Sequence, residues 1–448
     1  MAQAAAPRVG SGAMVVLPLA IVIALLGLTG ASLGWLGQGS RAWVWFSFFA
    51  ACALALYGIL LKVAERLPPR VLLLTAVLAQ AAVLPAAPFT SKDIYSNLAY
   101  GAILARGGNP FLVTPRSFFT VPGQDPFARA LDPQWLDTAC AYGPLTAALA
   151  GAAVKLGGSL EAALLYFKGF AAFAALLTLA IAWWIARRLG RPAWFAILGL
   201  NPLFAWELTG QAHNDGFVLP LIALFALAVR QNRALFAAAL AAISFLVKPV
   251  LLPVFVLWLV GMARQRRPGR PGRLGGVVAV CAALVAAGWL PFWAGHQTLA
   301  MAGKALVGGH VEAANSLAEM IWHLASYCSR AWREPTLHGL RVVGLGIVAW
   351  VGARALVRVW RGRDVLDEGL FVLLVSLGVV AWFQPWYVMW TLPLALVCPD
   401  RGLARIAAVY GAAFLPAYAT GLIGTSWLVH GGLFVALWRW RRRRVATS

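Results

Sequence analysis

Three carboxylates stand at the ends of apolar segments of this chain. Asp93 follows the third such segment, Glu207 ends the fifth and Asp215 opens the sixth. Ionisable side chains near membrane depth are costly and usually face a water-filled or protein-lined cavity. We therefore expect the three acids to line one shared, outward-facing site. The alternative is that each carboxylate simply marks a membrane interface.

The residues around Asp93 predict a short helix on that outer side. A carboxylate at the start of a helix is stabilised by the free amides and by the helix dipole. The Gly-Gly-Asn-Pro turn at 107–110 would end this helix. A capping role alone would explain an acid at position 93, so this alternative stays open.

Two further polar features interrupt apolar sequence. His213, Asn214 and Asp215 offer a hydrogen-bond donor, an amide and an acceptor in consecutive positions, although a polar turn between helices would look alike. Lys248 is the lone lysine of the apolar stretch 234–263 and precedes a proline. It is either a functional cation or a snorkelling side chain at a helix break.

The elements that position these residues belong to a membrane protein. Hydrophobic residues make up 61% of the 448 positions and charged residues 12%, a charged share about half that of soluble domains. At about 20 apolar residues per crossing, we predict an all-α, polytopic bundle of about fourteen spans. One transmembrane domain would cover 1–438, followed by a basic cytoplasmic tail at 439–448. The predicted spans are 13–36, 43–61, 71–87, 161–186, 194–208, 217–229, 234–263 (a pair broken at Lys248-Pro249), 274–291, 340–357, 370–383, 388–397, 406–423 and 427–438.

The net charge of +22 follows from arginines gathered in short gaps between apolar runs. This placement is typical of cytoplasmic helix ends and leaves no soluble fold to present a basic face to nucleic acid. The clusters are Arg66 and Arg70; Arg187, Arg188 and Arg191; Arg230 and Arg233; and the runs 264–273, 354–363 and 439–444. All of them fall on one side of the predicted topology.

Two longer stretches, 88–160 and 292–338, then lie outside. We expect a juxtamembrane helix in each, Tyr142 to Leu156 and Leu317 to Tyr327. The first is short for a crossing, and a crossing there would move Arg187 and Arg188 to the outer side. The five cysteines are far apart and most are expected to be apolar fillers, although Cys140 and Cys328 share the outer side, where a disulfide is an option.

Several motifs in this order resemble the GT-C glycosyltransferases. They are an Asp in the first large outer loop, the Gly-x-Asn-Pro-Phe run Gly107-Gly108-Asn109-Pro110-Phe111, Trp135 ahead of Tyr142-Gly143-Pro144-Leu145, Asn201-Pro202-Leu203 through Glu207 to His213-Asn214-Asp215, Lys248-Pro249 and Pro385-Trp386-Tyr387. The likeness is to polyprenol-phosphomannose-dependent α-1,6-mannosyltransferases and their relatives in glycosyltransferase family 87. It runs from about Asp93 to Pro393, roughly two-thirds of the chain, in the outer loops and helix ends of a membrane bundle. Phe111 stands where an aromatic Tyr is commoner, and the first loop has a single rather than a paired acid.

The resemblance implies transfer of a sugar, with mannose favoured, from a polyprenyl-phosphate carrier to a hydroxyl of an acceptor glycan or lipid on the outer face. In an inverting transfer Asp93 would be the general base, and Lys248 would stabilise the leaving phosphate. Tyr142, Trp386 and Tyr387 would stack against sugar or prenyl chain, or else form an interfacial aromatic belt. The proposed substrate-binding set is Tyr95, Asn109, Tyr142, Glu207, His213, Asn214, Asp215, Lys248, Trp386 and Tyr387.

Other points follow less directly. His310 and Glu312 lie in the second outer stretch, where they either contact the acceptor or belong to a solvated loop. No cofactor is expected, and the single acid leaves use of a divalent metal undecided. Composition and the lack of a targeting peptide favour a bacterial inner membrane, with the site facing the periplasm. A transporter or flippase of polyprenyl lipids or small molecules, and a noncatalytic lipid-binding subunit, remain the alternatives.

Overall fold

The computed structural model describes residues 13–119, 121, 123–265, 272–298, 300, 313–418 and 425–446. Within those residues helices joined by turns and loops make up the fold, and the one β-type pairing is an isolated parallel bridge between Ala314 and Trp382, so the predicted all-α class is confirmed there. The α-helices are α1 (Ala13–Ser32), α2 (Ser40–Val63), α3 (Pro69–Val83), α4 (Asp93–Ala105), α5 (Pro115–Phe118), α6 (Pro126–Ala130), α7 (Pro144–Gly157), α8 (Leu160–Arg188), α9 (Phe195–Gly199), α10 (Pro202–Ala205), α11 (Leu219–Arg230), α12 (Ala234–Val247), α13 (Leu252–Arg264), α14 (Gly272–Trp289), α16 (Leu317–Cys328), α17 (Arg333–Trp360), α18 (Val365–Val379), α19 (Thr391–Val397), α20 (Arg401–Ala417) and α21 (Ser426–Ala446).

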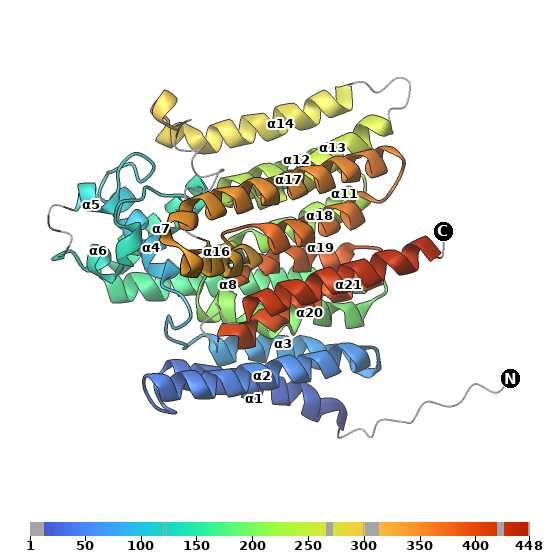
Figure 1. The fold of residues 1–448 in the computed structure, drawn as a ribbon, viewed down its shortest axis with the longest axis horizontal. Coiled ribbons are helices and arrows are strands. Elements are labelled where there is room, and N and C mark those ends of the chain that lie inside the picture. Colours follow the sequence, from blue (N-terminus) through green and yellow to red (C-terminus); the bar gives the residue numbers. More distant parts are fainter. Residues whose placement is uncertain are drawn as a thin grey trace.

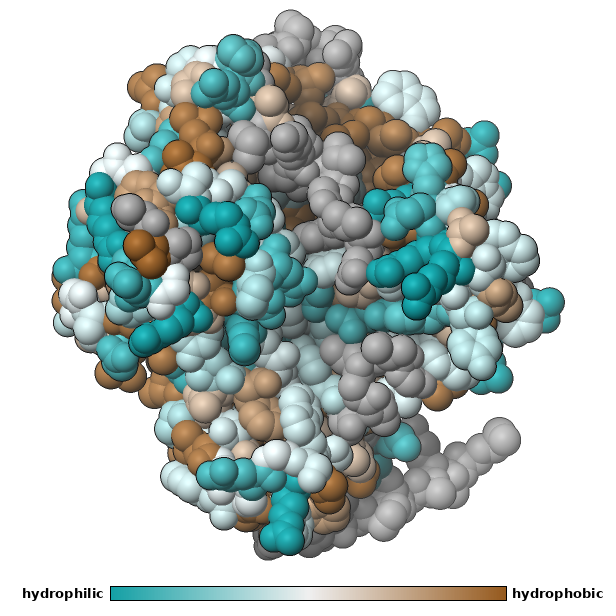
Figure 2. Space-filling view, turned by 60° about the vertical axis from the view of Figure 1, so that its left-hand side comes forward, coloured by the Kyte–Doolittle hydropathy of each residue, from teal (hydrophilic) through white to brown (hydrophobic). Residues whose placement is uncertain are grey.

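The long helices run side by side across the molecule (Figure 1). α1, α2 and α3 form one edge of the bundle and α14 the opposite edge. α4 to α7 and their connecting loops gather at one end, and the chain ends beyond α21 at the other end. Figure 2 brings the end with α4 to α7 forward and shows frequent hydrophilic side chains on its surface. The exposed ion pair Arg116–Asp137 belongs to the loops of this end.

Within the described residues, length and hydropathy identify four helices that can cross a bilayer. They are Ser40–Arg66, Leu160–Arg188, Leu274–Phe292 and Arg330–Trp360, and the bent pair Pro202–Gly210 and Asn214–Arg230 adds a fifth, broken span. Six shorter apolar helices of 10–17 residues accompany them. The protein is therefore an integral membrane protein, because such helices need the bilayer to cover their apolar surface. The larger number of about fourteen spans stays a prediction.

The predicted span 194–208 is wrong as a continuous helix. The chain instead forms a 3-10 turn (Pro192–Trp194), α9, α10 and the π-helical turn η4 (Trp206–Gly210), and the direction changes by 107° before Asn214–Arg230. Pro202 explains the first break because it has no amide to donate, and the Asn201 side chain accepts a hydrogen bond from the Leu203 amide instead. π-Helical turns are rare and are frequent at functional sites.

Other boundaries also differ from the predicted ones. The two helices expected in the outer stretches are confirmed as α7 and α16, each within two residues of its predicted start and end, and their placement at the membrane surface stays a prediction. α21 continues through the basic run to Ala446, so the predicted tail is helical over that range, and its cytoplasmic location stays a prediction. Cys140 and Cys328 are both free thiols, so the disulfide option is wrong.

α4 packs closely against α7 because both helices have small residues at their contact. An alanine at Gly101 would place its Cβ 2.6 Å from the carbonyl oxygen of Ala150. Backbone atoms cannot rotate away, so α4 would have to move, and α4 begins with Asp93. The position of Asp93 therefore depends on a glycine about two turns further along the same helix.

We expect Gly101→Ala to lower stability by about 1–3 kcal/mol through overpacking. The matched control is Gly169→Ala in α8, where the added methyl meets no atom within 4 Å and alanine favours the helix. Thermal unfolding of the purified variants in one detergent compares the two. Equal midpoints for Gly101→Ala and the parent would contradict the close α4–α7 packing.

Candidate active site

Asp93 is the first residue of α4, and it does not cap that helix. The N-cap position is Lys92, which makes no side-chain capping bond, and the Asp93 amide donates to Ser91 Oγ at 3.1 Å. The carboxylate is directed elsewhere, with Oδ2 lying 3.8 Å from His213 Nδ1. The capping explanation for an acid at this position is therefore wrong, and the side chain is available for another role.

The loop that leads to Asp93 is fixed by a glutamine from the broken span. Gln211 Oε1 accepts hydrogen bonds from the amides of Phe89 and Thr90, at 2.7 and 3.0 Å, and Gln211 Nε2 donates to the Ala87 carbonyl. These three bonds replace the backbone pairing that an irregular buried segment lacks. The loop before α4 and the break after η4 are thereby held together.

His213 lies between two carboxylates. Its Nε2 is 3.0 Å from Glu207 Oε2 while its Nδ1 faces Asp93, and Glu207 and His213 are fully buried. The imidazole stacks on the Trp386 ring, with centroids 3.7 Å apart and planes 19° apart. An imidazole between two acids can accept a proton from one side and remain stabilised from the other. This position suits control of the protonation of Asp93.

Asp215 and Lys248 form a second, adjacent group. Lys248 Nζ donates to both Asp215 oxygens at 2.9 and 3.1 Å, and Trp390 Nε1 donates to Asp215 Oδ1 at 2.6 Å. The Lys248 ammonium also lies over the rings of Tyr142, Tyr387 and Trp390, at 5.9, 4.7 and 5.2 Å from their centroids. Aromatic faces and a carboxylate both interact favourably with a cation, so four groups fix the position of the Lys248 side chain.

The two groups form one site. Asn214 Nδ2 donates to Asn97 Oδ1 at 3.2 Å, which ties the broken span to α4, and Trp386 packs edge-on against Tyr387 at 6.1 Å. Removal from water raises the pKa of Asp93, and the nearby His213 and Lys248 partly oppose that shift. A base with a raised pKa accepts a proton more readily, which suits general-base chemistry.

Most of the sequence-predicted residues meet here, namely Asp93, Tyr142, Glu207, His213, Asn214, Asp215, Lys248, Trp386 and Tyr387. Asn109 does not join them by any bond, because its Nδ2 donates to the Phe292 carbonyl and its Oδ1 accepts from the Phe111 amide. Tyr95 is half-buried and, within the described chain, makes no side-chain hydrogen bond. His310 and Glu312 lie outside the described residues.

Three residues of this region carry no prediction from the sequence. Trp390 does not stand out in a sequence that is rich in tryptophan. Gln211 is uncharged and lies two residues before the more conspicuous polar residues 213–215. Lys168, a buried lysine within the apolar segment 161–186, donates from Nζ to the carbonyls of Ala86 and Gly210. A lysine inside a predicted span was the one signal that could have drawn attention to it. Among the described residues no cluster of three or more His, Cys, Asp or Glu side chains is arranged to hold a metal ion.

These features define a polytopic membrane protein with a buried site of carboxylates, cations and aromatic rings at one end of its bundle. Residues 4–264 match the family model described as "Alpha-(1->6)-mannopyranosyltransferase, N-terminal domain". The chain therefore belongs to the alpha-(1->6)-mannopyranosyltransferase family of GT-C membrane mannosyltransferases.

Two relatives share this name. Alpha-(1->6)-mannopyranosyltransferase A of Mycobacterium tuberculosis is 28% identical over 366 residues, which cover 75% of this chain and 67% of that protein. Alpha-(1->6)-mannopyranosyltransferase A of Corynebacterium glutamicum is 28% identical over 184 residues, 39% of this chain and 36% of that protein. Similarity to the second protein is thus limited to about a third of its length.

Lys248→Met leaves the buried Asp215 carboxylate without its cation, and we expect this to cost about 3–5 kcal/mol. The double variant Asp215→Asn, Lys248→Met removes both charges and should regain most of that stability. Thermal unfolding in detergent measures the stability of both variants, and sugar transfer by the same samples measures their activity. A double variant that regains activity together with stability would show that the pair is structural only.

Proposed function

We propose that this protein is an inverting mannosyltransferase that moves mannose from a polyprenyl-phosphate carrier to a hydroxyl of a glycan or lipid acceptor on the outer membrane face. The observation that carries the proposal is the placement of Asp93. Its side chain is 27% exposed at the end of a bundle where Glu207, His213 and Asp215 are buried around it. A partly accessible carboxylate backed by buried polar groups is the expected arrangement for a base that meets a substrate hydroxyl.

In the proposed reaction, the acceptor oxygen attacks the anomeric carbon while the bond from that carbon to the phosphate oxygen breaks. Asp93 takes the acceptor proton, and the electron pair of the broken bond stays with the lipid phosphate. His213 keeps the Asp93 carboxylate oriented and ionised, since it contacts Asp93 on one side and Glu207 on the other. This positioning role replaces the sugar hydrogen bond expected of His213.

Lys248 stabilises the charge that develops on the leaving phosphate. Its side chain is 19% exposed although it is paired with Asp215, so Lys248 is not sealed inside the protein. A cation that is already in place needs no reorganisation when the phosphate leaves, and this lowers the barrier. Tyr142, Tyr387 and Trp390 surround the ammonium and exclude water from it. The same rings offer flat faces for a sugar or the first prenyl units.

A transporter remains the second candidate because it too would use a broken helix and charges at membrane depth. It would be favoured by a comparable acidic group facing the opposite end of the bundle. Asp364 and Asp400 lie at that end, but their side chains cap α18 and α20, and Glu368 pairs with Arg358 at 3.3 Å. These acids have structural roles, which favours the transferase.

Asp93→Asn should reduce mannose transfer by about 10²–10⁴-fold, since it removes the proton acceptor and keeps the size of the side chain. The matched control is Asp137→Asn, an aspartate of the same outer stretch that is exposed and paired with Arg116. Both variants are compared with the parent in lipid-reconstituted form, with a panel of polyprenyl-phosphate sugars. Full activity of Asp93→Asn, or a parent that binds the donors and turns none of them over, would contradict the proposal.

The acid limb of the pH–rate profile should lie at higher pH than the pKa of an ordinary aspartate. Asp93 must be deprotonated to act, and burial raises its pKa, so activity is lost as the pH falls through that raised value. His213 pulls the pKa of Asp93 down, so His213→Gln should move the limb to still higher pH. Initial rates at saturating donor measure this, with His323→Gln, a half-exposed histidine of α16, as control. An unmoved limb in His213→Gln would exclude the proposed role of His213.

A further inference from the structure

A cavity of about 820 Å³ lies at the end of the bundle opposite to Asp93. It is bordered by the ends of α11 and α13, the starts of α12 and α14, and the connection between α17 and α18. α11 begins just after Asp215 and ends at the cavity, and α12 returns from the cavity to Lys248. The cavity is thus separated from the proposed active site by the length of these helices.

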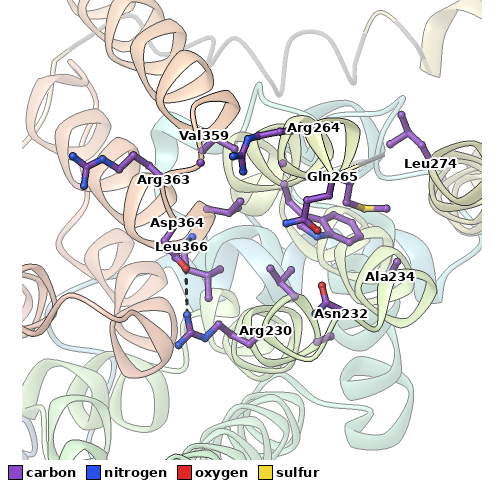
Figure 3. A pocket seen from close by; sticks show the side chains of 17 residues that line it. Arg230, Asn232, Ala234, Arg264, Gln265, Leu274, Val359, Arg363, Asp364 and Leu366 are labelled. Carbon is purple, nitrogen blue, oxygen red and sulfur yellow. Dashed lines mark hydrogen bonds and ion pairs between the residues drawn. The ribbon is translucent and has the colours of Figure 1, made fainter. Parts of the chain in front are cut away.

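Two arginines give the cavity its charge. Arg264 and Arg230 lie on different sides of it, with the Gln265 amide beside the first and Asn232 near the second (Figure 3). Arg230 is paired with Asp364 at 3.2 Å, and both side chains are about a third exposed. Arg264 lies against Gly362, and it has no carboxylate partner among the described residues. The Arg363 side chain borders the cavity but projects away from its centre in this view.

A helix start adds to the positive potential. α12 has 14 residues, begins at the cavity wall with Ala234, and has no side-chain cap at its N-terminus. The first amides of a helix and its dipole attract anions, and oxyanions with several acceptor oxygens use such amides together with arginine forks. The described groups around the cavity therefore combine two guanidiniums, side-chain amides and a helix N-terminus against a single carboxylate.

The rest of the wall is apolar, with contributions from Trp258, Met262 and Leu274. Leu274 belongs to the candidate span Leu274–Phe292, of which only 6% is buried within the protein, so its surface is left for lipid. An occupant that satisfies both parts of the wall has a charged group and an apolar part. Phospholipid headgroups at the boundary of the bilayer have this chemistry.

We propose that this cavity binds the phosphate group of an anionic membrane lipid. The headgroup lies inside the cavity, between the sides that carry Arg264 and Arg230, and the glyceryl part of the lipid passes along Leu274 toward the exposed face of α14. A free phosphate ion shares the same headgroup chemistry and is the alternative source. The occupant ties α14, which packs mainly on α12, to the connection that precedes α18.

Lipid retention by the purified full chain tests this site. The parent, the pocket variant Arg230→Gln, Arg264→Gln and the control variant Arg187→Gln, Arg188→Gln are exchanged into micelles that contain equal amounts of phosphatidylglycerol and phosphatidylcholine. The control removes the same charge from exposed arginines at the end of α8. Native mass spectrometry counts the retained lipids. We expect preferential retention of phosphatidylglycerol by the parent and the control, and about tenfold weaker retention for each charge-assisted hydrogen bond that the pocket variant removes.

Inorganic phosphate separates the two sources. Phosphate at ~10 mM is far above the Kd of a micromolar site and would fill it. Lipid retention that survives this concentration identifies the lipid headgroup as the occupant. Loss of the lipid, together with saturable phosphate binding in equilibrium dialysis, identifies a soluble anion instead. Equal retention by the pocket and control variants, or equal retention of the two lipids by the parent, would overturn the proposal. Gel filtration and thermal unfolding of both variants establish that each is folded.

Discussion

The structure depends on how the backbone N–H and C=O groups of an interrupted helix find hydrogen-bond partners inside an apolar bundle. Where the chain turns by 107° after Gly210, backbone groups lose their helical partners. Lys168 donates to the Gly210 carbonyl from α8 and also to Ala86, and Gln211 pairs with the loop at Ala87 to Thr90. Because both side chains bond the break and that loop together, Glu207 and Asp93 are brought to one place. The proximity of these two carboxylates is thus a consequence of how the unpaired backbone groups find hydrogen-bond partners.

A second helix break, between α12 and α13, positions the Lys248 ammonium. The backbone between α12 and α13 is extended at Lys248, since Pro249 disfavours a helical conformation at the residue before it. Gly143 approaches this break closely, and its amide donates to the Val247 carbonyl at 3.0 Å. A side chain at Gly143 would collide with the Leu246 carbonyl, which explains why glycine precedes Pro144 here. Tyr142 is thereby held over the ammonium of Lys248.

The sequence predicted the membrane class, the start of α4 at Asp93 and most residues of the site, because acids and a lysine next to apolar runs are conspicuous on energetic grounds. It failed where the partner of a residue decides its role. The sequence suggests that the Asn109 amide binds a ligand, but its side chain makes hydrogen bonds with the backbone of Phe292 and Phe111. Lys168 gives no sign in the sequence that it bonds two loop carbonyls. The segment 194–208 is apolar enough for a crossing, yet Pro202 and the π turn divide it. Hydropathy reports burial, and it contains no information about the direction of the backbone.

The α11–α12 hairpin links the two ends of the bundle. Asp215 precedes its first helix and Lys248 follows its second, while Arg230 and Ala234 border the basic cavity at its turn. The ion pair Arg230–Asp364 fastens this turn to the connection between α17 and α18, and the pair Lys248–Asp215 closes the hairpin at the other end. Asp215 is buried whereas Arg230 and Asp364 are each about a third exposed, so the two pairs differ in strength because solvent screens only the second. The hairpin is thus anchored firmly where the proposed mechanism needs a fixed cation, and only weakly at the cavity, where a bound phosphate would add the contacts that the ion pair alone does not supply.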